Sequence, residues 1–400
     1  MDSLYIALLS SKRLINYLKE ITQINPGYAG QKFNRLIIEG LKKNNINCRA
    51  FSSVPVNRMM SKKIFWNIKS EIEDSISYTY IPFVNLPYIH NICLLIYSFL
   101  YVLFWGIKNR KDKFVLMDVL NVSICLGSLF ACKLLKLHCV GIVTDMPGLM
   151  IDASLTHGRR NIISAAKICQ LYISTFDSYV FLTEQMNEVI NKKHRPYIIM
   201  EGVADCKINP IENLECDKED VVRTMLYAGG LHERYGLKLL VQAFTETNNI
   251  NYRLIIYGSG PFVEELKQYV KKDPRIEYRG VASNDEVIDA ELKATVLVNP
   301  RPTIEEFTKY SFPSKNMEYM STGRPLLTTK LPGMPKEYNK YVYLFEEETI
   351  KGYKQAIETI FSKPMYELNQ KGLNAQKWIL ENKNNIIQTK RILDLINYSK

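Results

Sequence analysis

The residues best suited to chemistry lie together in the segment SFPSKNMEYMSTGRP, residues 311–325. Pro313 fits the start of a helix, where its missing N–H is not needed. Ser314 and Glu318 are four residues apart, so they share one helix face, with Lys315 beside them. Free backbone N–H groups, a hydroxyl and an ammonium at a helix start suit a phosphate, and a carboxylate one turn later suits a sugar diol. The segment therefore fits a nucleotide lying along a helix start, with an ordinary capped helix as the alternative.

The helix predicted here has clear limits. Gly323 and Pro325 are expected to end it after about three turns, and 326–329 reads as a short apolar strand. We expect Glu318 to be a buried acid that accepts hydrogen bonds from the pentose.

Length and charge indicate two domains with different partners. The 400 residues are 46% hydrophobic and 23% charged, with a net charge of +11. Residues 1–200 hold 24 Lys and Arg against 13 Asp and Glu, whereas residues 201–400 hold 28 of each. A basic half could face nucleic acid or an anionic membrane. No zinc-finger spacing or RNA-binding aromatic signature occurs, so we favour a membrane surface and no nucleic acid.

The eight cysteines form no CxxC pair and most lie in apolar runs, which indicates a reducing compartment such as the cytoplasm. The first ten residues have no basic stretch before their apolar run, so they are not expected to be a signal peptide.

The first half opens like a doubly wound α/β domain. A strand over 5–9, a glycine loop NPGYAG that includes Gly30, a helix and a strand over 48–52 follow in order. The loop lacks the GxGxxG pattern, so a plain tight turn fits as well as a nucleotide loop. Residues 53–85 give no clear pattern.

Two carboxylates follow later strands of this half. Asp118 and Asp145 come after apolar runs at 114–117 and 139–143, and ligands of parallel sheets bind beyond such strand ends. Either could act as a base or position a hydroxyl, and either could instead cap a turn. His157, Arg159 and Arg160 could meet an anionic acceptor or be structural.

Residues 92–107, ICLLIYSFLYVLFWGI, are the most apolar stretch, followed by the basic sequence KNRKDK. Sixteen helical residues reach about 24 Å, short of the roughly 30 Å hydrocarbon core. A helix lying on a membrane surface and a buried helix of the domain both fit this pattern, and a single membrane span fits it less well.

The second half alternates strands and helices regularly, which predicts a second doubly wound domain. Its first three strands end at Gly229, Gly258 and Gly280, where a ligand can approach the backbone closely. Arg234 follows the first of these turns and could bind a diphosphate, or be a solvated surface residue. We expect domains over 1–204 and 223–380, a linker over 205–222, and a helix over 381–400 that packs near the first domain.

These segments together resemble the retaining glycosyltransferases of family 4, which have two Rossmann-like domains facing a cleft, the GT-B fold. The resemblance is good over roughly 178–385 and weaker before it. It rests on FLTEQM, IIMEGVAD, YAGGLHERYGLKLLVQAF, LIIYGSGP, IEYRGVASNDEV and SFPSKNMEYMSTGRP in this order, with GYAGQK and VTDMP in the first half.

The resemblance implies a nucleoside-diphosphate sugar donor, UDP- or GDP-linked, and a role for each matching position. Glu318 would bind the ribose, and Ser314 and Lys315 the diphosphate. Gly280 and Val281 would lie at the base. Gly30 would lie in the loop that approaches the donor phosphates from the first domain. Asp145 would lie near the acceptor pocket.

Two positions depart from the family pattern. Tyr310 stands where the family often has a glutamate that reaches the donor sugar, with Glu305 and Glu306 upstream. The family's arginine and lysine after Gly229 are also replaced, which leaves Arg234 as the candidate.

We expect sugar transfer with retention of configuration, in which Lys315, Arg234 and the helix N–H groups stabilise the departing diphosphate and Asp145 serves the acceptor. No metal is expected, because no DxD-like pair lies beside the donor residues. The basic, apolar first half suggests an acceptor saccharide on an anionic polyprenyl lipid, used for surface polysaccharide at the inner face of the plasma membrane. A catalytically silent membrane-docking protein and a sugar-nucleotide epimerase are the alternatives.

Overall fold

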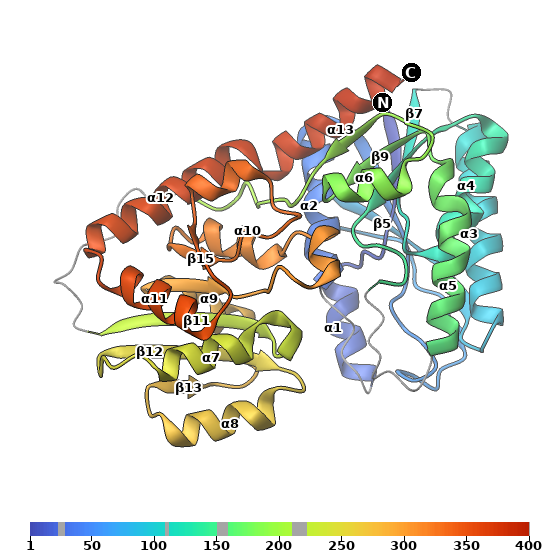
Figure 1. Ribbon diagram of the computed structural model, residues 1–400. Coiled ribbons are helices and arrows are strands. Elements are labelled where there is room, and N and C mark those ends of the chain that lie inside the picture. Colours follow the sequence, from blue (N-terminus) through green and yellow to red (C-terminus); the bar gives the residue numbers. More distant parts are fainter. Residues whose placement is uncertain (23–28, 109–111, 150–158, 210–221, 400) are drawn as a thin grey trace. The chain divides into compact units, whose positions relative to one another are not determined.

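The computed structural model describes residues 1–22, 29–108, 112–149, 159–209 and 222–399. The chain divides into two compact units, residues 1–203 with 385–400, and residues 204–384. The fold is mixed α/β in both (Figure 1). Most of the predicted linker, residues 210–221, lies outside the described residues.

The first unit is built on an eight-stranded sheet with the order β10-β9-β8-β7-β1-β2-β5-β4. All of its strand pairs are parallel except β4 with β5. The strands of the unit are β1 (Asp2–Ile6), β2 (Asn47–Ser53), β3 (Phe65–Trp66), β4 (Glu71–Glu73), β5 (Ile76–Ile81), β6 (Phe83–Val84), β7 (Lys113–Asp118), β8 (His138–Val143), β9 (Ser178–Phe181) and β10 (Tyr197–Ile199).

Helices cover both faces of this sheet (Figure 1). They are α1 (Lys12–Ile21), α2 (Ala29–Lys43), α3 (Ile89–Lys108), α4 (Val122–Leu135), α5 (Arg159–Tyr172), α6 (Glu184–Ile190) and α13 (Asn385–Ser399). Residues 53–85, whose sequence shows no clear pattern, contain the four strands β3 to β6. Two of these strands have only two residues each, too few for a periodic pattern to be seen.

The first strand is displaced from its prediction over 5–9. It begins at Asp2, which is paired with Asn47 on one side and Lys113 on the other. Leu9 lies beyond it and donates its N–H to the Ser52 hydroxyl, 3.0 Å away, instead of joining the sheet ladder.

The second unit has a six-stranded, wholly parallel sheet in the order β13-β12-β11-β14-β15-β16. In chain order this is 3-2-1-4-5-6, the Rossmann arrangement, whose direction of winding reverses between β11 and β14. The strands are β11 (Arg223–Gly230), β12 (Tyr252–Ser259), β13 (Ile276–Tyr278), β14 (Val296–Asn299), β15 (Leu326–Thr328) and β16 (Tyr343–Leu344).

Its helices are α7 (Leu237–Thr245), α8 (Val263–Lys272), α9 (Asn284–Lys293), α10 (Ser314–Ser321), α11 (Ile350–Phe361) and α12 (Met365–Asn382), with short 3-10 turns η2 (Glu233–Tyr235), η3 (Glu306–Lys309) and η4 (Lys336–Lys340). Two apolar cores lie on the two faces of the sheet, one beneath α7 and α11 and the other beneath α10 and α12.

The chain returns to the first unit at its end. Helix α12 stays with the second unit, and α13 packs on α2 of the first. A Cβ on Gly40 of α2 would lie 2.2 Å from the Asn385 carbonyl oxygen, so only glycine permits this approach. The boundary therefore falls after Asn384 instead of after residue 380.

Candidate functional site

The carboxyl ends of β11, β12 and β13 form a surface of bare backbone. Gly229 and Gly258 are paired in register, and the Gly258 N–H donates to the Gly280 carbonyl at 2.7 Å. Gly258 has φ +129°, and a Cβ there would lie 1.8 Å from the Gly229 oxygen. Gly280 has φ +67° with open space around it, and Val281 beside it is 76% exposed. A flat ligand could therefore reach the peptide groups at Gly280 directly.

Lys315 lies directly over Gly229. A Cβ on this glycine would be 2.1 Å from Lys315 Cε and 2.5 Å from Nζ. The ammonium also sits 5.7 Å from the centre of the Tyr227 ring. Burial lowers the pKa of Lys315, while Glu318 and Glu291 oppose that shift. A partly desolvated cation of this kind gains from an incoming anion.

Two arginines lie near the same pair of aromatic rings. The Arg234 guanidinium carbon is 5.5 Å from the Tyr235 ring centre and 5.7 Å from that of Phe307. The corresponding distances for Arg301 are 5.0 and 5.3 Å. The Nε of Arg234 is buried with no hydrogen-bond partner among the described residues. Stacking on aromatic faces holds such side chains while leaving guanidinium N–H groups for a ligand.

Arg301 was missed by the sequence analysis. It lies two residues beyond the end of β14, and Gly229 lies in the last two residues of β11. These two strands flank the point where the sheet reverses its winding. Ligands of open α/β sheets bind at that point. Its positive charge further lowers the pKa of Lys315, which places the two cations within electrostatic range. The segment VNPRP, an apolar strand followed by an arginine, was the available signal.

Helix α10 is fixed to the sheet by its buried face. Asn299 Nδ2 donates to Asn316 Oδ1 at 2.6 Å, and the Tyr319 hydroxyl accepts from the Ala228 N–H at 2.9 Å. Ser314 and Glu318 lie on the other face and are exposed. The expectation of a buried Glu318 is therefore wrong, because Asn316 and Tyr319 occupy the side of the helix that meets the sheet.

The helix is also shorter than predicted, since α10 spans eight residues and Thr322 follows as its C-cap. Pro313 is its N-cap residue and precedes the first turn. Tyr310 is half-buried after η3 and donates its N–H to the Phe307 carbonyl at 3.0 Å.

In the first unit, two carboxylates interact at the ends of β7 and β8. Burial raises the pKa of Asp118 to about 6; the Leu120 N–H opposes this shift and the nearby Asp145 adds to it. Asp118 accepts from Leu120 N at 3.1 Å and from Asn121 Nδ2 at 3.2 Å, so it caps a turn. Asp145 is half-exposed and lies two residues after the end of β8.

The other predicted residues of this unit are only partly visible. Gly30 lies in the first turn of α2, and residues 25–28 of its predicted loop, 25–30, lie outside the described residues. His157 also lies outside them, and α5 begins at Arg159. Among the described residues, no group of three His, Cys, Asp or Glu side chains could hold a metal ion.

The second unit resembles a family of known proteins. Residues 222–363 match the family model described as glycosyl transferases group 1. This part of the second unit is therefore similar to group 1 glycosyltransferase domains. By this match the chain is a glycosyltransferase. The matched residues run from β11 to α11 and include Lys315, Arg234 and Arg301.

Solved structures agree on the fold of this glycosyltransferase. The lipopolysaccharide outer core galactosyltransferase WaaB, in its apo form, is similar with a TM-score of 0.61 and 16% identity over 100% of both chains. Sucrose-phosphate synthase from Thermosynechococcus elongatus gives 0.67 and 14%, also over 100% of both. Anabaena HepE in complex with UDP-glucose gives 0.63 and 12% over 100% of both. The fold is therefore GT-B. A search of curated protein sequences gave no match.

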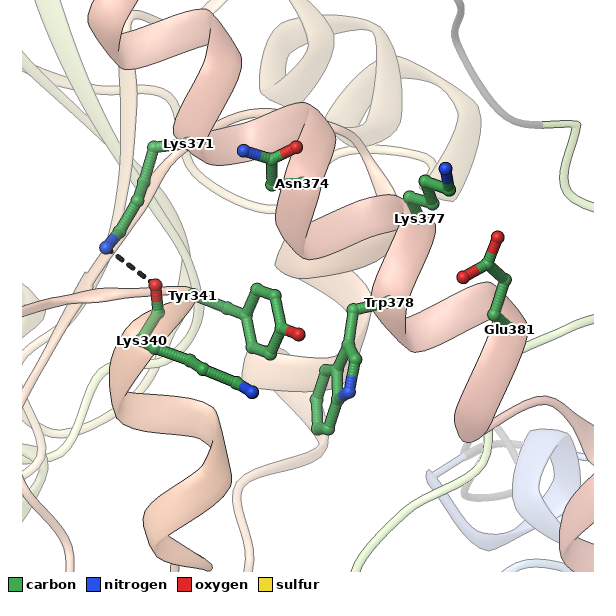
Figure 2. Close-up of a pocket in the computed structure, with 7 residues that line it drawn as sticks. All are labelled: Lys340, Tyr341, Lys371, Asn374, Lys377, Trp378 and Glu381. Carbon is green, nitrogen blue, oxygen red and sulfur yellow. Dashed lines mark hydrogen bonds between the residues drawn. The ribbon is translucent and has the colours of Figure 1, made fainter.

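The glycosyltransferase domain also carries a pocket away from these residues. It has a volume of about 340 Å³ and lies between the end of η4 and helix α12 (Figure 2). The rings of Tyr341 and Trp378 stack at 4.6 Å, and Lys371 Nζ donates to the Lys340 carbonyl at 2.8 Å. None of the predicted site residues lines it, so it is not the candidate donor site.

Proposed function

We propose that this glycosyltransferase transfers a sugar from a nucleoside-diphosphate sugar to a saccharide acceptor with retention of configuration, as family 4 enzymes do. The observation that carries the proposal is the group of three cations, Lys315, Arg234 and Arg301, at the reversal point of a Rossmann sheet. A diphosphate is the ligand whose charge and size suit this group.

The donor would lie along the carboxyl edge of the sheet. Its diphosphate would meet Lys315 and the two arginines, with Ser314 and the first N–H groups of α10 completing the contacts. The exposed carboxylate of Glu318, one turn along, would accept hydrogen bonds from the ribose. The base would lie against Gly280 and Val281. HepE in the UDP-glucose complex is a structural neighbour, so UDP sugars are the first donors to test, with GDP sugars second.

Catalysis would come from stabilising charge that develops on the leaving diphosphate. As the anomeric carbon separates from the diphosphate oxygen, negative charge grows there, and fixed cations in a partly desolvated site stabilise it more than water does. The acceptor hydroxyl oxygen forms the new bond on the same face of the sugar, and the hydroxyl proton passes to the departing diphosphate. Asp145 would orient that hydroxyl. No metal ion is required by this scheme.

The acceptor would be a saccharide on a polyprenyl lipid, used in surface polysaccharide biosynthesis at the cytoplasmic face of the plasma membrane. Support comes from the excess of basic residues in the first half and from the apolar helix α3. Acceptors anchored in an anionic membrane are reached by proteins that bind its surface.

The test is turnover of a panel of UDP and GDP sugars, with and without lipid-linked acceptors, by the wild type and by the Lys315→Ala and Glu318→Ala variants. We expect slow donor hydrolysis by the wild type and faster transfer with the right acceptor, both lost in the variants. Tyr310 at the position of the family's usual glutamate favours a silent docking protein, and absence of turnover with every donor would support that reading. An epimerised donor without transfer would instead indicate an epimerase.

A further inference from the structure

Helix α3 has an apolar surface that the fold leaves uncovered. It runs from Ile89 to Lys108 and is long and apolar enough to cross a membrane. Only 17% of its most apolar 18-residue stretch is buried inside the fold. The exposed residues recur every three or four positions and so form one continuous stripe on the helix. The α3 stripe consists of Ile89 (45% exposed), Ile92 (56%), Ile96 (51%), Leu100 (42%), Phe104 (66%) and Ile107 (63%).

The opposite face of α3 is held firmly to the unit. Leu94, Ser98 and Val102 are buried against α4. A Cβ on Gly127 of α4 would lie 2.2 Å from the Leu95 carbonyl oxygen, which shows how closely the two helices approach. At the end of α3, Lys113 of β7 donates to the Trp105 carbonyl at 3.3 Å. The stripe is therefore the outer face of a packed crossover helix; Figure 1 shows α3 beside α4.

This packing corrects one step of the sequence argument. At 20 residues α3 is about 30 Å long, so its length does not exclude a membrane span. Spanning would instead require α3 to leave α4 and lose the Lys113 contact. Lying flat with the stripe turned outward requires neither.

A second apolar element is fixed beside the start of α3. We call residues 58–65 the basic-apolar loop. Met59 and Phe65 are each 72% exposed, and Ile64 is 40% exposed. The loop is held by the buried Asn85. Its backbone N–H donates to the Ile64 carbonyl at 2.7 Å, and its side-chain Nδ2 donates to the carbonyls of Ser61 and Lys63.

The same connection reaches the helix through aromatic rings. Trp66, next to the loop, stacks with Phe83 at 6.4 Å, and Phe83 lies 4.3 Å from the His90 ring in the first turn of α3. These ring contacts therefore connect the loop to the start of the stripe.

Exposed cations frame this surface. Arg58, Lys62 and Lys63 lie in the loop at one end, and Lys108 ends the stripe at the other. The sequence has no Asp or Glu at 44–70 or at 75–111. Apolar side chains framed by cations are the pattern of helices that lie in the interface of an anionic bilayer.

We infer that the α3 stripe and the basic-apolar loop together dock this protein on an anionic lipid bilayer, with α3 lying in the plane of the membrane surface. A second copy of the chain is a poor occupant, because a symmetric pairing would bring the framing cations of both copies toward one another. The inference rests on the proposed function only for the purpose of docking, which would bring the donor-binding site close to a lipid-linked acceptor.

The test is flotation of the full chain with phosphatidylglycerol-rich vesicles and with pure phosphatidylcholine vesicles. The stripe variant carries Ile92→Gln, Ile96→Gln and Phe104→Gln. Its control carries Ile250→Gln, Ile304→Gln and Tyr366→Gln, three apolar positions of the second unit that are also exposed. We expect the wild type and control to bind anionic vesicles, and the stripe variant to bind about tenfold less.

The charge requirement is tested separately. Lys62→Gln with Lys63→Gln should weaken binding, whereas Lys192→Gln with Lys193→Gln, an exposed pair with the same change in charge, should not. Binding of the wild type should fall as salt rises. Melting temperature and circular dichroism show whether each variant is folded.

Three results would overturn the inference: no binding of the wild type to anionic vesicles, equal binding by the folded stripe variant, or a dimer in solution that the stripe variant dissociates. Donor hydrolysis is measured on the same samples without lipid. Vesicle binding without hydrolysis would refute the proposed function alone, and hydrolysis without vesicle binding would refute the docking surface alone.

Discussion

The two units share a parallel-sheet architecture and differ in what lies at the carboxyl ends of their strands. In the second unit these ends carry glycines and three cations, Lys315, Arg234 and Arg301. In the first unit they carry two interacting carboxylates, Asp118 and Asp145. A cationic edge suits a diphosphate, whereas a carboxylate edge would repel one and suits sugar hydroxyls. One architecture thus offers two chemistries, decided by the few residues that follow each strand.

Replacing Lys315 should have the largest effect on the cationic edge of the second unit. We expect Lys315→Ala to lower kcat/KM about 10² to 10³-fold, because it removes the cation closest to the bare backbone at Gly229. Stability should change little, since a partly desolvated charge is lost with its contacts. Steady-state kinetics with the best donor gives the ratio, and the exposed Lys330→Ala is the control. Equal activity of Lys315→Ala and wild type would rule out the diphosphate assignment.

Arg301 sharpens the contrast, because the sequence alone did not reveal it. Arg301→Ala should lower kcat/KM roughly 10- to 100-fold, and Arg301→Lys should recover only part of the loss, since lysine does not form the planar fork that binds two phosphate oxygens. The affinity for UDP itself, measured by calorimetry, should fall in parallel. Full activity of the alanine variant would mean that Arg301 only packs on Tyr235 and Phe307.

Adjacent glycines give a matched pair for the next effect. A methyl group at Gly229 would lie 2.1 Å from Lys315 Cε, whereas at Gly230 its nearest neighbour, in the Tyr235 ring, is 3.3 Å away. Gly229→Ala should therefore displace the lysine and raise the donor KM about tenfold, with about 1 to 3 kcal/mol lost in the free energy of unfolding. Gly230→Ala should be much milder in both. If both variants lost the same donor affinity and stability, the cause would be general crowding of β11 and not displacement of Lys315.

The smallest effect concerns the first unit and depends on pH. The Asp118 pKa of about 6 exceeds its value in the unfolded chain, so the native state binds more protons between about pH 4 and 6. The contribution of this group to the free energy of unfolding is therefore present at low pH and lost as pH rises to about 6. Because the side chain is only half-buried, we expect about 1 kcal/mol.

The Asp118→Asn variant tests this point, since its side chain has no titrating proton but can still accept from Leu120. Urea unfolding of wild type and variant at several pH values gives a difference curve. That curve should slope between about pH 4 and 6 and be flat above. A difference curve that is flat throughout would show that Asp118 is not shifted in the native state.

Much of the second unit could be predicted from local pattern. The predicted alternation is present as β11 to β14 with α7 to α9 between them, because buried parallel strands separated by amphipathic helices leave a strong periodic signal. The reading failed where the signal is short or uniform. β3 and β6 have two residues each, and α3 is apolar on all sides, so its sequence does not indicate which face is covered.

Composition and spacing by themselves determined the fold class, the alternating strands and helices of the second unit, and a phosphate-suited helix start with Lys315 and Glu318 one turn apart. These features are local, and the residues that specify them are neighbours in the chain. Only the tertiary structure decided that Arg301 meets Arg234 at shared aromatic rings, that Glu318 is exposed, and that the outer stripe of α3 is left uncovered. Each of these depends on which strand ends and helix faces come together through contacts between distant residues, and no periodicity within one segment encodes that pairing.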